Sequence, residues 1–295
     1  MTASNYTCRY CRLPSDASGI SCPNCGAPVD VKAVVSKSGW IQQPPIMDMA
    51  RIRFGQSRLQ IEGNQVPVAD FNLSGPEWIY FSHHVLLWAD QSAQLAAMKM
   101  KGGWSRHLAG IPLIMVQGSG PGHIALSDNH AGDMIALPLQ AGQAMWVREH
   151  RLIAATGNIT YDFNKSDVWF TTQEDDDEEW HWPLGQYNDI FYAAQEPGLL
   201  LLHSPGNTFI RDLAPNETIL MQASALLYRD PTVGVHLHLE YPRSQGFFGW
   251  ARSYEHRTVW LRAVGPGRIA MQSVFERPEG AEPIRRSSYT TTQRW

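Results

Sequence analysis

The stretch Leu73 to Asp90, LSGPEWIYFSHHVLLWAD, decides the fold because two later stretches share its pattern. They are Leu139 to Thr156, LQAGQAMWVREHRLIAAT, and Leu213 to Asp230, LAPNETILMQASALLYRD, and all three align without a gap. Each opens with Leu, passes through a turn and contains two apolar runs separated by mostly polar residues. This pattern predicts a strand, a tight connection and a second strand. We therefore expect one β-unit used three times.

A second motif also returns along the chain. Gly120-Pro-Gly-His-Ile-Ala-Leu is echoed by Gly265-Pro-Gly-Arg-Ile-Ala-Met, with a looser Ser204-Pro-Gly-Asn-Thr-Phe-Ile between them. Pro followed by Gly supplies the φ angles of a type II turn, so each copy should lead a strand out of a sharp reversal. As a phosphate-binding loop the motif is weak, because a β-run and not a helix follows it.

Composition limits the classes of function. The chain has 295 residues, of which 43% are hydrophobic and 18% charged, and its eleven Trp indicate a well-buried protein or one with faces for self-association. Lys and Arg number 24 against 28 acids, so the charge of −4 gives no electrostatic case for binding DNA or RNA. We find neither a run of ~20 apolar residues that could cross a membrane nor a secretory signal, and we expect a cytoplasmic protein.

The strongest chemical signal is a pair of CxxC motifs near the start. Cys8 and Cys11 form the first pair, and Cys22 and Cys25 form the second. Two such pairs can place four thiolates at the corners of a tetrahedron, which is the geometry of a structural zinc site. A site with four sulfur ligands has no open position, so we expect it to provide structure and contact surface, not catalysis.

Two other interpretations of these cysteines are weaker. Two disulfides would suit a secreted domain, but no secretory signal is present. A redox CxxC is disfavoured because there are two copies and no βαβ context. A unit of about thirty residues has too little core to fold alone, so metal binding would supply its folding free energy.

The sequence predicts four regions. Residues 1–30 form the zinc ribbon, 31–49 a linker with Trp40 and Pro44-Pro45, and 278–295 a disordered tail rich in Ser, Thr, Arg and Pro. Between them, residues 50–277 form the β-body. Its units should span about 50–109, 110–189 and 190–277.

Two charged segments interrupt the β pattern. Lys101, Arg106 and His107 form a local basic cluster that we interpret as a solvated loop, with a contact loop for a partner or an anionic ligand as the alternative. The acidic run Glu174 to Glu179 should form a disordered loop tip because its carboxylates repel one another. The alternative is a divalent-cation site, which is weaker because the run lacks the spaced ligands and the Gly of a calcium loop.

Histidines supply the one candidate for an open metal site. His236 and His238 should project from one face of a strand with Glu240, as in cupin-type dioxygenases, but the spacing to the Glu is too short and no third His is marked. His83 and His84 should point to opposite faces of their strand. No motif of a hydrolase, a P-loop or a zinc protease occurs, so no sequence feature demands an enzyme.

The repeat cores and Gly-Pro-Gly turns, with Phe81-Ser82-His83-His84 and Gln272-Ser273-Val274-Phe275-Glu276, together resemble the AIM24 family, also described as DUF124 or TRAP-like proteins. The likeness spans about Met49 to Arg277. It implies an all-β fold of three repeated β-sandwich units in a pseudo-threefold body, related in architecture to the trp RNA-binding attenuation protein. Members lack an established activity. The mitochondrial members are linked to inner-membrane organisation, and a zinc ribbon here stands where their transit peptide would be.

We expect a non-enzymatic cytoplasmic β-scaffold that self-associates or binds another protein, with the zinc ribbon as a second contact module. Three similar sheets around one core leave outer edges that can pair with neighbours. The first alternative is a TRAP-like protein that binds RNA or a small ligand, which predicts a basic, aromatic strip or a pocket between units. The second is a cupin-like metalloenzyme that uses His236 and His238.

Overall fold

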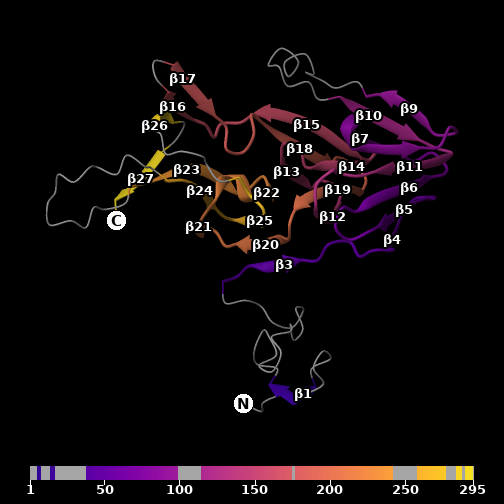
Figure 1. Cartoon of the computed structure of the whole chain (residues 1–295), viewed down its shortest axis with the longest axis horizontal. Coiled ribbons are helices and arrows are strands. Elements are labelled where there is room, and N and C mark those ends of the chain that lie inside the picture. Colours follow the sequence, from indigo (N-terminus) through magenta and orange to yellow (C-terminus); the bar gives the residue numbers. More distant parts are fainter. Residues whose placement is uncertain are drawn as a thin grey trace.

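The expected all-β fold class is confirmed in the computed structural model (Figure 1). The structure describes residues 5–7, 14–16, 38–98, 114–174, 177–241, 258–276, 284–287 and 290–294. Within these ranges the only helical elements are two short 3-10 turns, η1 (His83–Val85) and η2 (Ala223–Ala225).

Four sheets form the body, and we number them I to IV. Sheet I has the order β4 (Arg51–Phe54), β5 (Ser57–Glu62), β6 (Val68–Leu73), β11 (Gly122–Leu126), β8 (Leu86–Ala89). Sheet II has the order β12 (Gly132–Leu139), β19 (Gly198–Pro205), β14 (Leu152–Thr156), β7 (Trp78–Ser82), β10 (Met115–Ser119), β9 (Gln94–Ala97). Sheet III has the order β15 (Ile159–Lys165), β18 (Tyr187–Ala193), β13 (Ala144–Arg148), β22 (Leu226–Arg229), β25 (Gly267–Gln272), β20 (Thr208–Leu213), β3 (Ile41–Gln43). Sheet IV has the order β21 (Thr218–Met221), β24 (Thr258–Val264), β23 (Gly234–Tyr241), β27 (Thr290–Arg294).

Two smaller sheets lie outside this body. The first joins β17 (Asp177–His181), β16 (Phe170–Glu174) and β26 (Ile284–Ser287), and the second pairs β1 (Asn5–Thr7) with β2 (Pro14–Asp16). The pairings of named strands are antiparallel except that of β23 with β27, which is parallel.

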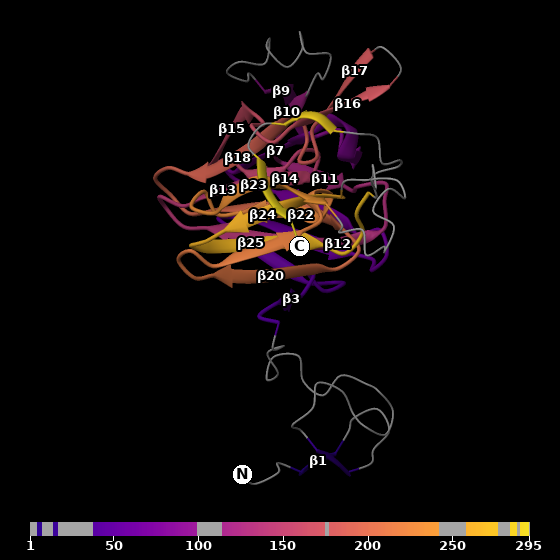
Figure 2. The same cartoon turned by 90° about the vertical axis from the view of Figure 1, so that its left-hand side faces the viewer.

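Three hydrophobic cores lie between successive sheets. The first lies between sheets I and II and contains Phe71, Ile79 and Leu201. The second lies between sheets II and III and the third between sheets III and IV. The indigo and purple strands of sheet I and the orange strands of sheets III and IV accordingly lie at opposite ends of the body, with β14 and β19 between them (Figures 1 and 2).

Sheet II is covered on both faces. In β19, Leu201 belongs to the core shared with sheet I, whereas Leu200 and Leu202 belong to the core shared with sheet III. Because successive side chains of a strand point to opposite faces, a strand buried on both sides needs a continuous apolar run. The sequence Leu199 to Leu202 meets this requirement.

The three repeated stretches occupy corresponding places in these sheets. Leu73, Leu139 and Leu213 are buried and end β6, β12 and β20. Each is followed by a strand, a short connection and a second strand: β7, η1 and β8 in the first stretch, β13 and β14 in the second, and β21, η2 and β22 in the third. The expected strand, tight connection and strand therefore form in every copy.

The second strand of each copy also pairs in the same way. β11 lies between β6 and β8, β19 between β12 and β14, and β25 between β20 and β22. The three pairings with β8, β14 and β22 contain the same register shift, which leaves Leu87, Ile153 and Leu227 as the extra residue. A bulge of one residue bends and twists a strand locally. These three residues hold the same position in the aligned stretches.

The Gly-Pro-Gly motifs form corners between sheets, and the expected type II turn is wrong. The Gly120–Pro121 and Gly265–Pro266 peptide bonds are cis, and φ at Gly122 and Gly267 is 141° and 132°, whereas a type II turn needs about 80°. A strand does follow each corner, β11 and β25. The corresponding start of β19 is Pro197-Gly198, so the sequence comparison missed the true third copy of this motif.

Three further expectations differ from the structure. Glu174 and Asp177–His181 belong to the paired strands β16 and β17, not to a disordered tip, since Trp180 stacks against Trp169 and Trp182 and steadies the hairpin. The region 278–295 includes β26 and β27, which pair with β16 and β23. Within the expected linker, β3 pairs with β20, and Trp40 packs against the third core.

Several predicted features lie outside the described residues. They are the four cysteines of the expected zinc ribbon, Cys8, Cys11, Cys22 and Cys25, and the basic cluster Lys101, Arg106 and His107. No helix among the described residues has the length and apolar character needed to cross a membrane.

Candidate interaction surfaces

Two joints show how one repeated stretch adds to the next. In the first joint β7 pairs with β14, so that Tyr80 lies opposite Ala155. In the second joint β13 pairs with β22, so that Trp146 lies opposite Arg229. The guanidinium carbon of Arg229 lies 4.1 Å from the centre of the Trp146 ring, a cation–π contact across the joint. Each joint thus continues one sheet from one stretch into the next.

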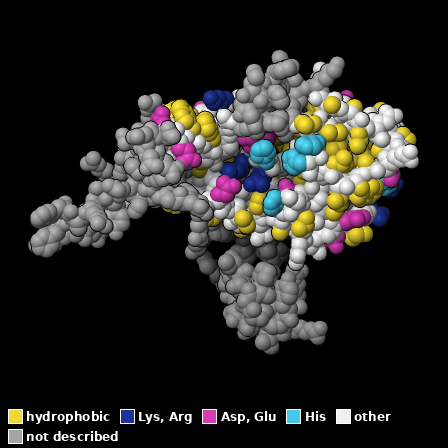
Figure 3. Space-filling model, turned by 45° about the horizontal axis from the view of Figure 1, so that its top comes forward, with side chains coloured by type: hydrophobic (Ala, Val, Ile, Leu, Met, Phe, Trp, Pro, Cys, Tyr) yellow, Lys and Arg dark blue, Asp and Glu magenta, His cyan; other side chains and the backbone are white. Residues whose placement is uncertain are grey.

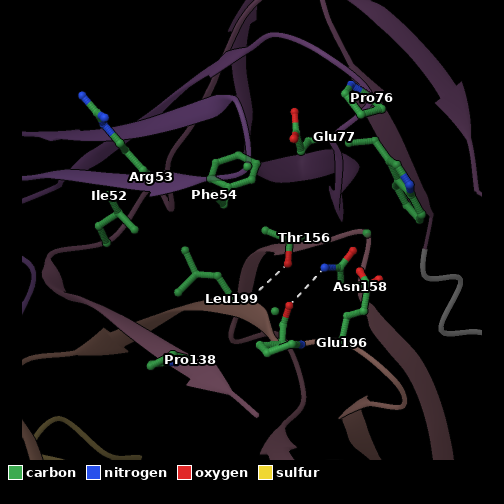
Figure 4. Close-up of a pocket in the computed structure, with 15 residues that line it drawn as sticks. Ile52, Arg53, Phe54, Pro76, Glu77, Pro138, Thr156, Asn158, Glu196 and Leu199 are labelled. Carbon is green, nitrogen blue, oxygen red and sulfur yellow. Dashed lines mark hydrogen bonds between the residues drawn. The ribbon is translucent and has the colours of Figure 1, made fainter. Parts of the chain in front are cut away.

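A cleft of about 580 Å³ opens beside the first joint. Ile52, Arg53 and Phe54 form one side of it, and Pro138 and Leu199 lie opposite (Figure 4). The backbone N–H of Leu199 donates to Thr156 Oγ at 2.9 Å, which holds the start of β19 in place (Figure 4). The apolar lining suits a small hydrophobic molecule or an extended peptide.

Glu77 supplies fixed negative charge at this cleft. The backbone N–H of Gln56 donates to its carboxylate at 2.9 Å, and the Ser57 hydroxyl donates at 3.2 Å. The hydrogen bond from Gln56 lowers the pKa of Glu77, with a smaller contribution from Ser57. Glu77 is therefore an ionised acceptor at neutral pH and not a proton donor.

A second cleft, of about 670 Å³, lies at the corresponding place beside the second joint. Arg268 donates to both carboxylate oxygens of Asp212 at 2.8 and 2.9 Å, and its backbone N–H donates to Asp230 at 2.7 Å. The hydrogen bond from Arg268 lowers the pKa of Asp212. Tyr228 donates to Gln43 at 2.7 Å, and burial raises its pKa. These groups already have hydrogen-bond partners, so the cleft is better suited to binding a molecule than to reacting with one.

A polar cluster gathers around the connections within the first and second stretches. Asp128 accepts from His130 at 2.8 Å and lies 3.5 Å from Nδ1 of the buried His203. His84 shares a hydrogen bond of 2.8 Å with the Ser82 hydroxyl. Histidines also lie beside basic and acidic side chains near the middle of the face in Figure 3.

Burial sets the protonation of this cluster. It lowers the pKa of His203, and the nearby Asp128 opposes part of that shift. Burial also lowers the pKa of His84. Burial lowers the pKa of Arg148 to about 10, and this side chain donates to the Pro183 carbonyl at 2.9 Å. His84 and His203 are therefore mainly neutral near pH 7, and Arg148 remains charged.

Arg148 also borders a cleft of about 340 Å³ that has aromatic walls. The rings of Phe170 and His181 stack with centres 4.8 Å apart, and those of Trp180 and Trp182 stack at 5.7 Å. The Arg148 guanidinium suits an anionic group and the aromatic rings suit a planar one, but the acidic Glu276 lines the same cleft.

The histidines considered from sequence do not assemble into a site. His236 and His238 lie two residues apart on β23, as expected, but no three His, Cys, Asp or Glu side chains among the described residues converge to hold a metal ion. The side chain of Glu240 lies outside the description. His83 and His84 lie in η1 and not in a strand, so strand alternation does not describe them; their rings meet edge to face.

Outer sheet edges were expected from the sequence, and the structure shows two of them at strands that the sequence did not single out. β8 ends sheet I and β21 ends sheet IV, each with one partner among the described strands. Leu87 and Trp88 of β8 are 58% and 46% exposed, and Leu220 of β21 is 43% exposed. The terminal copies of a repeat lack one neighbour, so their edges could have been suspected from the alignment alone.

The family model described as Mitochondrial biogenesis AIM24 matches residues 59–274, from β5 to just beyond β25. The chain belongs to the AIM24 family. The match covers the three aligned stretches and most strands of the four sheets, whereas β3, β4, β26, β27 and the four cysteines lie outside it.

A solved structure shares the fold of this chain. The crystal structure of protein SPYM3_0169 from Streptococcus pyogenes matches with a TM-score of 0.52 and 17% sequence identity. The match covers 75% of the present chain and 94% of that chain, and at this identity it shows a shared fold alone. The search of curated proteins found no match. The family model therefore shows the family, and the solved structure shows a shared fold.

Proposed function

We propose that this AIM24-family protein is a non-enzymatic β-scaffold that self-associates or binds another protein. The single observation that carries the proposal is the pair of open edges with exposed apolar side chains at the two ends of the body, Leu87 and Trp88 on β8 and Leu220 on β21. Unpaired backbone groups beside exposed apolar surface favour the addition of another strand.

The proposal also covers parts of the architecture that the sequence predicted. The body consists of three repeated units joined in series. A pseudo-threefold, TRAP-like body would in addition require a pairing of β8 with β21 that closes the three units into a ring. The first 30 residues form a zinc ribbon in which Cys8, Cys11, Cys22 and Cys25 bind structural zinc. The ribbon acts as an accessory contact module. A cytoplasmic location fits this role.

Native mass spectrometry and sedimentation velocity of the purified full chain test the scaffold. The mass should rise with protein concentration, or a defined partner should co-purify in fixed stoichiometry. Elemental analysis should give one zinc per chain, and comparison with a preparation stripped of zinc shows whether the ribbon contributes. A chain that remains monomeric and retains no partner in fixed stoichiometry contradicts the scaffold.

The two clefts beside the joints favour a second candidate, the binding of a small ligand between units. The first cleft is lined mainly by apolar side chains and the second by a mixture of apolar and polar ones, and hydrogen bonds hold the carboxylates of Glu77 and Asp212 in place. Saturable binding of an apolar fluorescent probe that Leu199→Lys abolishes would support this function. Leu199 lines the first cleft, so an unchanged affinity in that variant would oppose it.

A further inference from the structure

The open edges at the two ends of the body correspond to the two halves of the internal joints. β21 holds the place in the third stretch that β7 and β13 hold in the first and second. β8 holds the place in the first stretch that β14 and β22 hold in the second and third. β7 pairs with β14, and β13 pairs with β22, so β21 and β8 are the remaining complementary pair.

Burial at matched positions shows what these edges lack. Leu87 is 58% exposed, whereas its counterparts Ile153 and Leu227 are both 0% exposed because a preceding stretch covers them. Trp88 follows the same rule, since Tyr228 is buried at the corresponding position. The first stretch has no predecessor within the chain, so these two side chains remain uncovered.

The other edge shows the same asymmetry. Leu220 in β21 is 43% exposed, whereas its counterparts at the two joints are less exposed: Tyr80 in β7 is fully buried and Trp146 in β13 is half-buried. Both edges therefore carry apolar side chains at positions that the internal joints bury. Covering these side chains would remove apolar surface from water, which stabilises a contact by about 25 cal/mol for each Å² buried.

Neither edge carries the usual protection against pairing. Natural edge strands are commonly blunted by Lys, by Pro or by charges that point inward. β8 reads Leu-Leu-Trp-Ala and β21 reads Thr-Ile-Leu-Met, with no charged residue and no proline in either. The bulge at Leu87 does not prevent pairing, because β14 and β22 contain the same bulge and form the joints.

We infer that β21 of one copy pairs antiparallel with β8 of a second copy, so that this protein assembles head to tail through a third joint of the same kind. The inference rests on the proposed scaffold function and names its contact. The contact is heterologous, so repeated addition gives a ring if the rotation closes and a filament if it does not.

The internal joints also fix the register of this contact. Tyr80 lies opposite Ala155 and Trp146 opposite Arg229, and these two pairs occupy the same positions of the aligned stretches. The matching pair between copies is Leu220 opposite Ala89. Met221 then lies opposite Trp88.

Variants that block one edge at a time test the pairing. Leu87→Lys blocks β8 and Leu220→Lys blocks β21, and each should weaken self-association by about tenfold or more, equivalent to ~1.4 kcal/mol. Each variant alone should therefore be monomeric at the concentration at which the wild-type chain begins to assemble. Val66→Lys alters another exposed apolar residue away from both edges and should leave the mass distribution unchanged. The midpoint of urea unfolding, measured for every variant, should stay at the wild-type value because all three positions are exposed.

Mixing the two blocked variants separates head-to-tail pairing from other contacts. Each variant retains the edge that the other lacks, so the mixture should form a one-to-one heterodimer, whereas either variant alone stays monomeric. Pairing of β8 with β8 would instead leave Leu220→Lys dimeric. The absence of a heterodimer, or self-association of either blocked variant alone, overturns the inference.

A disulfide scan tests the register. Leu220→Cys combined with Ala89→Cys should give an intermolecular bond between these two positions, identified by mass spectrometry of the linked peptide, because opposed residues bring their Cβ atoms within reach. Leu220→Cys with Leu87→Cys is the control out of register and should link less. Preferential linkage of the control pair refutes the register.

The outcomes also separate this inference from the scaffold proposal. If the wild-type chain self-associates and the blocked variants do so equally, the contact lies elsewhere and the scaffold stands. If the wild-type chain stays monomeric, the inference is refuted. In that case the scaffold function is supported only if a partner co-purifies in fixed stoichiometry.

Discussion

Matched Leu→Ala changes at Leu227 and Leu87 should differ strongly in their effect on stability. The two residues occupy the same bulge position in β22 and β8, but Leu227 is fully buried in the core between sheets II and III, while Leu87 is 58% exposed. Their chemistry and backbone setting are the same. The comparison therefore isolates burial.

The magnitude follows from the groups removed. Leu→Ala deletes three carbon atoms, worth ~2.4 kcal/mol when fully buried at ~0.8 kcal/mol per methylene. A cavity in a core held by two sheets adds ~1–2 kcal/mol, so Leu227→Ala should lower the free energy of unfolding by ~3.5–4.5 kcal/mol. Leu87→Ala loses a partly exposed side chain and leaves no cavity, so its cost should be ~1 kcal/mol or less.

Urea unfolding followed by tryptophan fluorescence provides the measurement. It should be made at the lowest practical protein concentration, because assembly through β8 would bury Leu87 and raise its apparent contribution. Equal m-values are required before midpoints are converted to free energies. If Leu87→Ala costs as much as Leu227→Ala in the monomer, the assignment of β8 as an open edge is wrong.

Three further changes test the polar interior and the corners. Tyr80→Phe removes a buried hydroxyl that has no hydrogen-bond partner among the described residues, so the free energy of unfolding should stay unchanged or rise by up to ~1 kcal/mol, and a clear loss in urea unfolding would reveal a partner. Burial lowers the pKa of His203 below its ordinary 6.5, so its contribution to stability is complete above pH 6.5 and is lost as the pH falls through its folded-state pKa. Unfolding midpoints measured from pH 7.5 to 5 should therefore decline, and His203→Gln should decline less steeply; equal slopes would show that other groups cause the loss. Gly120→Ala would place a Cβ 2.3 Å from the Leu73 carbonyl oxygen and should lower the midpoint more than Gly142→Ala, whose Cβ meets nothing within 4 Å and carries only the ~1 kcal/mol cost of its positive φ; equal midpoints would argue against that close corner.

The sequence predicted local structure better than the links between units. The aligned leucines at 73, 139 and 213 predicted strand ends, because a repeated apolar pattern requires repeated burial. The continuous run Leu199 to Leu202 was assigned to the third unit, and its place in a sheet buried on both faces was not foreseen. Apolar runs indicate burial, but they do not say which neighbours cover each face.

The remaining errors have physical causes. The Gly-Pro bonds are cis, which residue types alone do not specify. The acidic run was expected to repel itself out of order, but Trp169 and Trp180 stack nearby and Glu178 accepts from the Thr171 hydroxyl at 2.9 Å. The sequence predicts outer edges but not which strands form them, because Leu220 cannot be told from a buried apolar strand residue until its missing neighbour is known.

The strand order of sheet II limits how early this protein can fold during translation. β7 near residue 80 cannot receive its neighbour β14 until translation has passed residue 156, and β14 itself waits for β19, which ends at Pro205. During translation the nascent chain therefore exposes unpaired, leucine-rich strands until their partners have been synthesised. Chaperones can bind these exposed apolar segments in that period. Premature stops between the first and third stretches should yield insoluble fragments instead of smaller working proteins.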